Sequence, residues 1–278
     1  MTPATMAVPA ARFADLLAAE WLKLRSLRST YWALGVSTLV VIAFNANAAR
    51  ADYADYPRYN TVMRAHFAGN ALSDAFTNGA AMILILTAAS VGAGTVVGEY
   101  STGLIRTTFA AVPDRRALIS AKATVVTAVI TAYGAVVASV SFAVTQAILS
   151  GHGLGLSIGH PGALRVVVAS ALLAPVSALV GMAMGVLIRH SATTMVLTTG
   201  LLLLVPTFFT ERYHWTACVR NALPFNAWGR LVQVDYGHMP YTLAHRYPST
   251  VAGAWVVFAV WAGAAAVVAV GVVGRRDV

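Results

Sequence analysis

The sequence has 278 residues, of which 58% are hydrophobic and only 10% are charged. Soluble domains carry about 25% charged residues, so these few charges cannot cover a soluble protein of this length. The net charge of +9 does not indicate a nucleic-acid partner, because the cations flank apolar blocks and form no run longer than two residues. The composition therefore predicts an integral membrane protein that binds the lipid bilayer and no nucleic acid.

Six apolar blocks are long enough to cross a bilayer as helices, which takes about 20 residues each. In chain order they cover residues 31–49, 75–97, 123–149, 166–187, 194–209 and 250–273. No block contains Asp, Glu, Lys, Arg or His within these limits, and a charge at a helix centre would cost roughly 2.5–3.5 kcal/mol. The predicted fold class is all-α: a polytopic membrane protein of about six transmembrane helices, forming a single transmembrane domain over residues 1–278.

The distribution of cations predicts that both termini lie in the cytoplasm. With this orientation, 11 Lys and Arg residues fall on the cytoplasmic side and eight fall outside, and the strongest clusters flank the first and third spans. The sequence has 17 Arg but only two Lys and is rich in Ala, Val and Gly, which is typical of a bacterial genome of high GC content. We therefore expect a multi-pass protein of the bacterial plasma membrane.

Residues 12–29 predict an amphipathic helix on the inner membrane surface. At 100° per residue most apolar side chains fall on one arc, and Leu22 lies off it; those on the arc are Phe13, Leu16, Leu17, Trp21, Leu24 and Leu27. Lys23 and Arg25 flank or oppose that arc, where they can meet anionic headgroups. Glu20 interrupts the arc and leaves two interpretations open. The helix is either a simple anchor for the first span, or Glu20 pairs with a cation elsewhere in the chain or in a partner.

The segment 98–116, between the second and third spans, predicts a helix, a break and a second helix on the cytoplasmic side. Glu99, Gly103 and Arg106 are spaced to share one face of a short helix. Asp114 is a plausible N-cap for the helix that continues into the third span. An acid and several arginines on such a loop suit docking to a soluble partner, and a solvated connector explains them equally well.

The segment 210–249 predicts an external loop with short helices at the membrane surface, because its Trp and Tyr residues favour that depth. Six of the seven histidines fall outside and share no metal-binding spacing. Cys218 is the single cysteine, so no disulfide forms within the chain. We expect neither a metal site nor a cofactor bound by this chain.

Sequence motifs argue against an enzyme and against an ion-coupled carrier. The chain has no Gly-Lys pair and so no phosphate-binding loop, and the G-x-S-x-G match at Ser157 lies in an external loop rather than between a strand and a helix. The spans hold no Asp, Glu or His, the residues that normally relay ions within a membrane. Their polar residues either line a transport path or join helices; the path-lining candidates are Asn45, Asn78, Tyr133 and Gln146.

In its segment order the chain resembles the permease subunits of type-2 ABC exporters, which serve bacterial drug, antibiotic and polysaccharide efflux. Residues 19–29 are similar to the amphipathic N-terminal helix of that family. The first coupling loop of the family is matched by residues 98–106 together with Pro113, Arg115, Arg116 and Lys122. The tail at 274–277 resembles the arginine pair that closes such permeases. The resemblance covers nearly the whole chain, and its most specific part is the coupling loop.

The resemblance implies that two permeases, either two copies or this chain and a homologue, form a translocation path. Each permease would dock a separate ATP-binding subunit, and that partner would hold the ATP and Mg. We expect Glu99→Arg to leave membrane insertion intact and to uncouple transport from ATP hydrolysis. An ion-coupled secondary carrier and a non-transporting membrane sensor or scaffold remain the alternative functions. The implied contact residues for the ATPase are Glu99, Tyr100, Arg106, Arg115, Arg116 and Arg189.

Overall fold

The computed structural model describes residues 12–65, 67–112, 114–234 and 247–273, and the regular elements among them are all helical. Within this part of the chain, six helical segments are long and apolar enough to cross a membrane. The all-α prediction and the number of candidate spans are therefore confirmed. These segments are Arg28–Arg58, Phe67–Ser101, Arg115–Ser150, Ala163–Ile188, Ser191–Phe208 and Val251–Val273.

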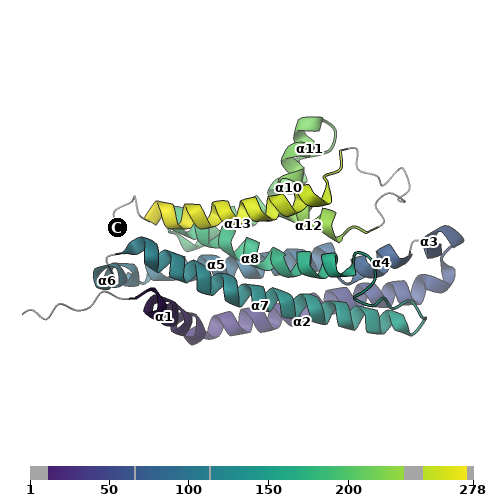
Figure 1. Cartoon of the computed structure of the whole chain (residues 1–278), viewed down its shortest axis with the longest axis horizontal. Coiled ribbons are helices and arrows are strands. Elements are labelled where there is room, and N and C mark those ends of the chain that lie inside the picture. Colours follow the sequence, from purple (N-terminus) through teal and green to yellow (C-terminus); the bar gives the residue numbers. More distant parts are fainter. Residues whose placement is uncertain (1–11, 66, 113, 235–246, 274–278) are drawn as a thin grey trace, which may run out of the picture.

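The long helices run side by side, with short helices at their ends (Figure 1). The long elements are α2 (Arg28–Asp55), α5 (Asn78–Ser101), α7 (Arg115–Ser150), α8 (Ala163–Ile188) and α13 (Val251–Val273). The fifth span is composed of α9 (Ser191–Thr199), the π-helical turn η2 (Gly200–Leu204) and α10 (Val205–Phe208). The other short elements are α1 (Phe13–Ser26), η1 (Tyr56–Arg58), α3 (Thr61–Ala65), α4 (Phe67–Asp74), α6 (Leu104–Ala111), α11 (His214–Asn221) and α12 (Pro224–Val232).

Several helices extend beyond the apolar limits predicted from the sequence. Helix α7 begins at Arg115 rather than at residue 123, because the Asp114 carboxylate accepts a hydrogen bond from the Ala117 N–H at 2.9 Å and caps it. The predicted N-cap is thus confirmed. The longer helices include charged residues, notably Glu99 near the end of α5 and Lys122 two turns into α7. Two parts of the sequence resemblance, Pro113 and the tail at 274–277, lie outside the described residues.

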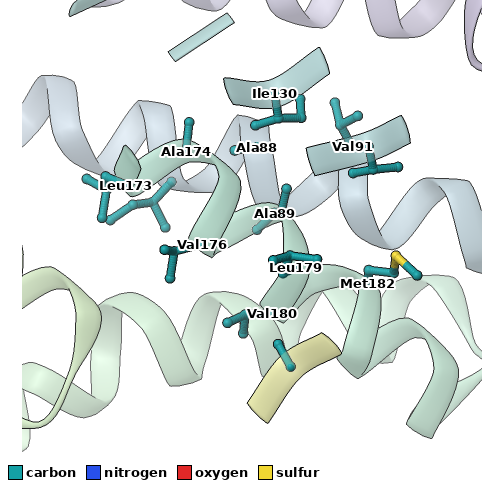
Figure 2. Close-up of a cluster of buried hydrophobic side chains, with 14 of the residues drawn as sticks. Ala88, Ala89, Val91, Ile130, Leu173, Ala174, Val176, Leu179, Val180 and Met182 are labelled. Carbon is teal, nitrogen blue, oxygen red and sulfur yellow. The ribbon is translucent and has the colours of Figure 1, made fainter. Parts of the chain in front are cut away.

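Helices α5 and α8 form the centre of the bundle and pack through small side chains. In Figure 2, Ala88 and Ala89 of α5 lie among Leu173, Ala174 and Leu179 of α8. A Cβ atom added to Gly92 would lie 2.0 Å from the Ala178 carbonyl oxygen, and one on Gly181 would lie 2.1 Å from that of Ala89. The two backbones therefore approach as closely as glycine allows, which is the packing expected where lipid supplies little hydrophobic driving force between helices.

The outer helices expose large apolar side chains. A continuous apolar surface of this kind is unsuited to water and is what lipid contact requires. The short helices α1 and α6 lie at one end of the bundle, and α3 and α4 lie at the opposite end (Figure 1). The exposed apolar side chains of the long helices and the fifth span include Trp32, Leu39, Val196, Phe208, Val256, Val260 and Val267.

Candidate functional site

Four charged side chains meet at the end of the bundle that carries α1 and α6, and we call them the ionic cluster: Glu20, Lys23, Glu99 and Lys122. Lys23 Nζ donates to Glu20 Oε1 at 2.8 Å and to Glu99 Oε1 at 2.9 Å. Lys122 Nζ donates to Glu99 Oε1 at 2.9 Å and forms a short contact with Glu20 Oε2. Two carboxylates and two ammonium groups thus neutralise one another.

The ionic cluster joins three helices that are distant in the sequence. Glu20 lies on α1 between Leu16 and Leu24, at the spacing of one helical face, and all three side chains are buried. That face packs against α7, where Lys122 projects toward it, and Glu99 reaches the same point from the end of α5. The structure therefore decides between the two interpretations of Glu20: it pairs with cations within the chain.

The two lysines of the ionic cluster differ in how far their side chains are buried. The side chains of Lys122 and Glu20 are each 3% exposed, whereas that of Lys23 is 43% exposed. Burial lowers the pKa of Lys23, but hydrogen bonds to the Glu20 and Glu99 carboxylates outweigh it, so the pKa rises above the ordinary 10.5. The cluster therefore keeps Lys23 charged. The buried ionic cluster favours the arrangement of α1, α5 and α7 in which all four charges are paired, because a buried charge without a partner raises the free energy of the folded chain.

Both lysines of the sequence belong to the ionic cluster, although the sequence also has 17 arginines. An ammonium is a compact charge with three N–H donors, so a single Nζ can bond carboxylates from two different helices. The planar guanidinium of arginine favours two parallel bonds to one carboxylate instead. The residue type thus matches the three-helix geometry of this site.

A sharp turn separates the cluster from α6. Gly103 has a φ of 72°, in the left-handed region that favours glycine, and it ends α5 so that α6 can start at Leu104. Glu99 and Arg106 therefore belong to two different helices, and the prediction that they share one face of a single short helix is wrong. On α6, Ile105 and Phe109 are buried; of Arg106 the structure describes the backbone alone.

Two arginines stack on aromatic rings beside the cluster. Arg189 Cζ lies 5.0 Å from the centre of the Tyr100 ring, and Arg115 Cζ lies 5.0 Å from the centre of the Phe109 ring. Arg189 ends α8 with a φ of 60°, a left-handed conformation that turns the chain toward α9. The structure thus brings Glu99, Tyr100, Arg115 and Arg189 to one end of the bundle.

The remaining residues predicted for this end are exposed. Arg116 lies in the first turn of α7 with its side chain exposed, and Trp21 and Arg25 are exposed on α1. On α1, the predicted helix of residues 12–29 is present as Phe13–Ser26. Glu20 and Lys23 therefore act inside the chain, while Trp21 and Arg25 remain available to surroundings such as headgroups.

Three of the four path-lining candidates form hydrogen bonds between segments. Asn45 donates to Ser141 Oγ at 3.1 Å and accepts from the Thr77 backbone N–H at 3.0 Å, so it joins α2, α7 and the start of α5. Tyr133 Oη lies 2.7 Å from Ser37 Oγ. Gln146 donates to the Ala71 carbonyl at 2.9 Å and accepts from the Leu156 N–H at 2.8 Å. Each is thus occupied in holding the bundle together.

Asn78 is exposed at the start of α5 and lines a cavity of about 220 Å³. This cavity is also lined by Glu211, Arg220, Asn226 and Arg230, and an ion pair joins Glu211 to Arg220. It lies at the opposite end of α5 from Glu99, so the two predicted groups do not form one site.

Sequence reasoning missed the pairing that makes the ionic cluster. Lys122 entered only as part of a family resemblance, and its partner Glu20 is 102 residues away. The signal that could have found it is the lysine count, since two lysines in an arginine-rich chain invite a search for carboxylates.

No protein-family model matches this sequence, and no curated protein matches it.

Proposed function

We propose that this chain is the membrane-spanning permease subunit of an ATP-driven exporter of the type-2 ABC class. A separate ATP-binding subunit would dock on the end of the bundle that carries α6. The observation that carries the proposal is the short helix α6, which follows the buried span α5 directly and leads directly into α7. Six candidate spans and the resemblance of residues 98–116 support the same assignment.

Contacts of α6 with the rest of the bundle support a role in transmitting the motion of a partner. Ile105 and Phe109 pack it against the bundle, Gly103 fixes the turn before it, and Asp114 caps the helix after it. A displacement of α6 would therefore tilt α5 and α7. Because Lys122 holds both Glu20 and Glu99, α1 would move with them as one body.

The partner would bind ATP and Mg, and closure of two such partners would drive the change of access between two permeases. The second permease is either a copy of this chain or a homologue. In this proposal both termini face the cytoplasm of a bacterium, as the bias of 11 cations against eight indicates. Accessibility of single cysteines to a membrane-impermeant reagent at each end would test that orientation, after Cys218 is replaced.

The test is reconstitution with the ATP-binding protein encoded beside this chain, identified by a Gly-x-x-x-x-Gly-Lys-Ser/Thr motif. A negative charge introduced at an exposed position near the docking end, by Thr107→Glu or by Arg116→Glu, should weaken the complex about tenfold and reduce stimulated ATP hydrolysis. Arg58→Glu is the matched control, because the Arg58 side chain is 84% exposed on η1, at the opposite end of the bundle from α6. This control should bind the partner normally.

Two outcomes would replace the proposal with its alternatives. Solute movement by the purified chain alone in vesicles, driven only by an ion gradient, would identify an ion-coupled carrier. Absence of a complex with the neighbouring ATPase, together with normal localisation and no transport, would favour a sensor or scaffold. The variants at positions 107 and 116 would then behave like the control.

A further inference from the structure

A cavity of about 350 Å³ opens beside the ionic cluster, and we call it the amphipathic cavity. Its volume is in the range of small-ligand sites. One part of its lining is polar and is formed by all four residues of the ionic cluster. The other part is apolar and includes Leu24, Val125 and Val126. A ligand that fills this space needs a charged head and an apolar body.

The polar wall offers many hydrogen-bond acceptors. The hydroxyls of Thr95, Thr102 and Thr108 each donate to a carbonyl of their own helix, which leaves their oxygen lone pairs facing other partners. Glu99 is 9% exposed, and its Oε2 has no donor among the residues that the structure describes. The terminal torsion of a glutamate is soft, so a small rotation would present this oxygen to the cavity.

Lys23 supplies a positive counterpart at the same wall. Two of its three N–H donors bond Glu20 and Glu99, and its side chain is 43% exposed. The third N–H can therefore reach an anionic group in the cavity. Because the ionic cluster is neutral, it attracts a headgroup that carries both signs better than one that carries a single negative charge.

The cavity crosses the boundary between polar and apolar parts of two spans. Glu99 and Lys122 lie just outside the apolar blocks 75–97 and 123–149, whereas Val125 and Val126 lie inside them. Leu27 and Leu104 line the cavity and are also exposed. The exposed part of the lining thus includes large apolar side chains of the kind that lipid contact requires, which favours a ligand that enters from the bilayer.

We propose that the amphipathic cavity binds phosphatidylethanolamine. The primary ammonium of the lipid donates to Glu99 Oε2 and to the threonine hydroxyls, the phosphate accepts from Lys23 Nζ, and the upper acyl chain lies against Val125 and Val126. Phosphatidylcholine has the same phosphate and chains, but its quaternary ammonium has no N–H to donate. Discrimination between these two lipids is therefore the signature of the site, and it does not depend on a partner ATPase.

The test uses the purified full chain, stripped of lipid in detergent and offered palmitoyl-oleoyl forms of the two lipids in equal amounts. Native mass spectrometry counts the lipids that remain bound. We expect phosphatidylethanolamine to be held about tenfold more tightly than phosphatidylcholine, the effect of one hydrogen bond to a charged acceptor. Equal retention of the two lipids would overturn the proposal.

A cavity-filling variant tests the location. Gly94 lines the cavity, and a Cβ added there meets no atom within 4 Å, so Gly94→Leu places a bulky apolar side chain in open space and replaces no residue of the ionic cluster. We expect about tenfold weaker phosphatidylethanolamine binding. Gly263→Leu on α13 is the matched control, because a Cβ there also meets nothing within 4 Å and Gly263 lies outside the cavity.

Unchanged binding by Gly94→Leu would place the lipid elsewhere and overturn the assignment. If that variant does not fold, the comparison of the two lipids on the unaltered chain still decides. Free phosphoethanolamine forms a third arm. It should compete only weakly, because it lacks the apolar body; competition as strong as that of the lipid would show that the site takes a soluble amine phosphate, and the lipid proposal would fail.

Discussion

Replacement of Lys122 by methionine tests the energetic role of the ionic cluster. Methionine has nearly the same length as lysine and lacks the charge, so Lys122→Met removes the ammonium with little change in packing. Lys122 is 3% exposed and bonds both Glu20 and Glu99. The variant leaves these two carboxylates buried at one point with Lys23 as their remaining cation in the cluster.

The loss of stability should be large. Removal of one partner from a buried ion pair costs about 3–5 kcal/mol, because the other charge stays buried without compensation. Lys23 still contacts both carboxylates, so we expect the lower end, about 3 kcal/mol, or a change of more than about 100-fold in the unfolding equilibrium. Lys23→Met should cost only about 1 kcal/mol, since the Lys23 side chain is 43% exposed and screened by solvent.

Denaturant unfolding in mixed micelles, followed by far-ultraviolet circular dichroism, measures these differences. Arg58→Met is the matched control: it breaks the exposed pair with Asp55, whose charged atoms are 3.6 Å apart, and should change stability by less than about 0.5 kcal/mol. Adding Glu20→Gln to Lys122→Met should recover part of the loss, because it removes an unpaired buried charge. A Lys122→Met variant as stable as the Arg58→Met control would refute the reasoning.

Three further substitutions test other contacts, each by thermal unfolding of the purified chain. Gly181→Ala should lower the free energy of unfolding by about 1–3 kcal/mol, because the added Cβ would lie 2.1 Å from a backbone oxygen. Gly263→Ala, where a Cβ meets nothing within 4 Å, should leave stability unchanged. Equal effects of the two substitutions would contradict the close packing of α5 and α8. Asp114→Ala should cost about 1 kcal/mol through loss of the N-cap of α7, and Asp114→Asn should retain most of that stability. Tyr133→Phe should cost about 0.5–1.5 kcal/mol, and a double-mutant cycle with Ser37→Ala should show coupling.

Hydropathy was sufficient to predict six spans because every backbone polar group in lipid must be satisfied within the segment, which leaves long apolar helices as the solution. It was insufficient for the helix ends. Hydropathy places the start of the third block at residue 123, since Lys122 reads as a flanking charge, and it was the capping pattern at Asp114 that predicted the earlier start of this helix. The helix continues through Lys122 because Glu20 and Glu99 neutralise that lysine and Asp114 provides a cap eight residues earlier.

The ionic cluster itself was beyond the reach of pattern reasoning. Periodicity placed Leu16, Trp21 and Leu24 on one arc of α1, and the structure buries Leu16 and Leu24 but leaves Trp21 exposed. The pattern could only mark Glu20 as an interruption of that arc. Its partner lies 102 residues away on another helix, and no local rule relates two such positions. Physical chemistry nonetheless required some partner, because a carboxylate on a buried face is stable only when a cation or several donors reach it.

Burial of Glu99 also changes how docking has to be tested. The sequence suggested that Glu99→Arg would uncouple transport from ATP hydrolysis and leave membrane insertion intact. Glu99 is 9% exposed and contacts both Lys23 and Lys122, so an arginine there would bring three cations together and destabilise α5 against α1 and α7. A loss of transport in that variant would not identify a docking contact. Exposed positions such as Thr107 and Arg116 avoid this ambiguity, because a glutamate introduced there replaces no residue of the ionic cluster.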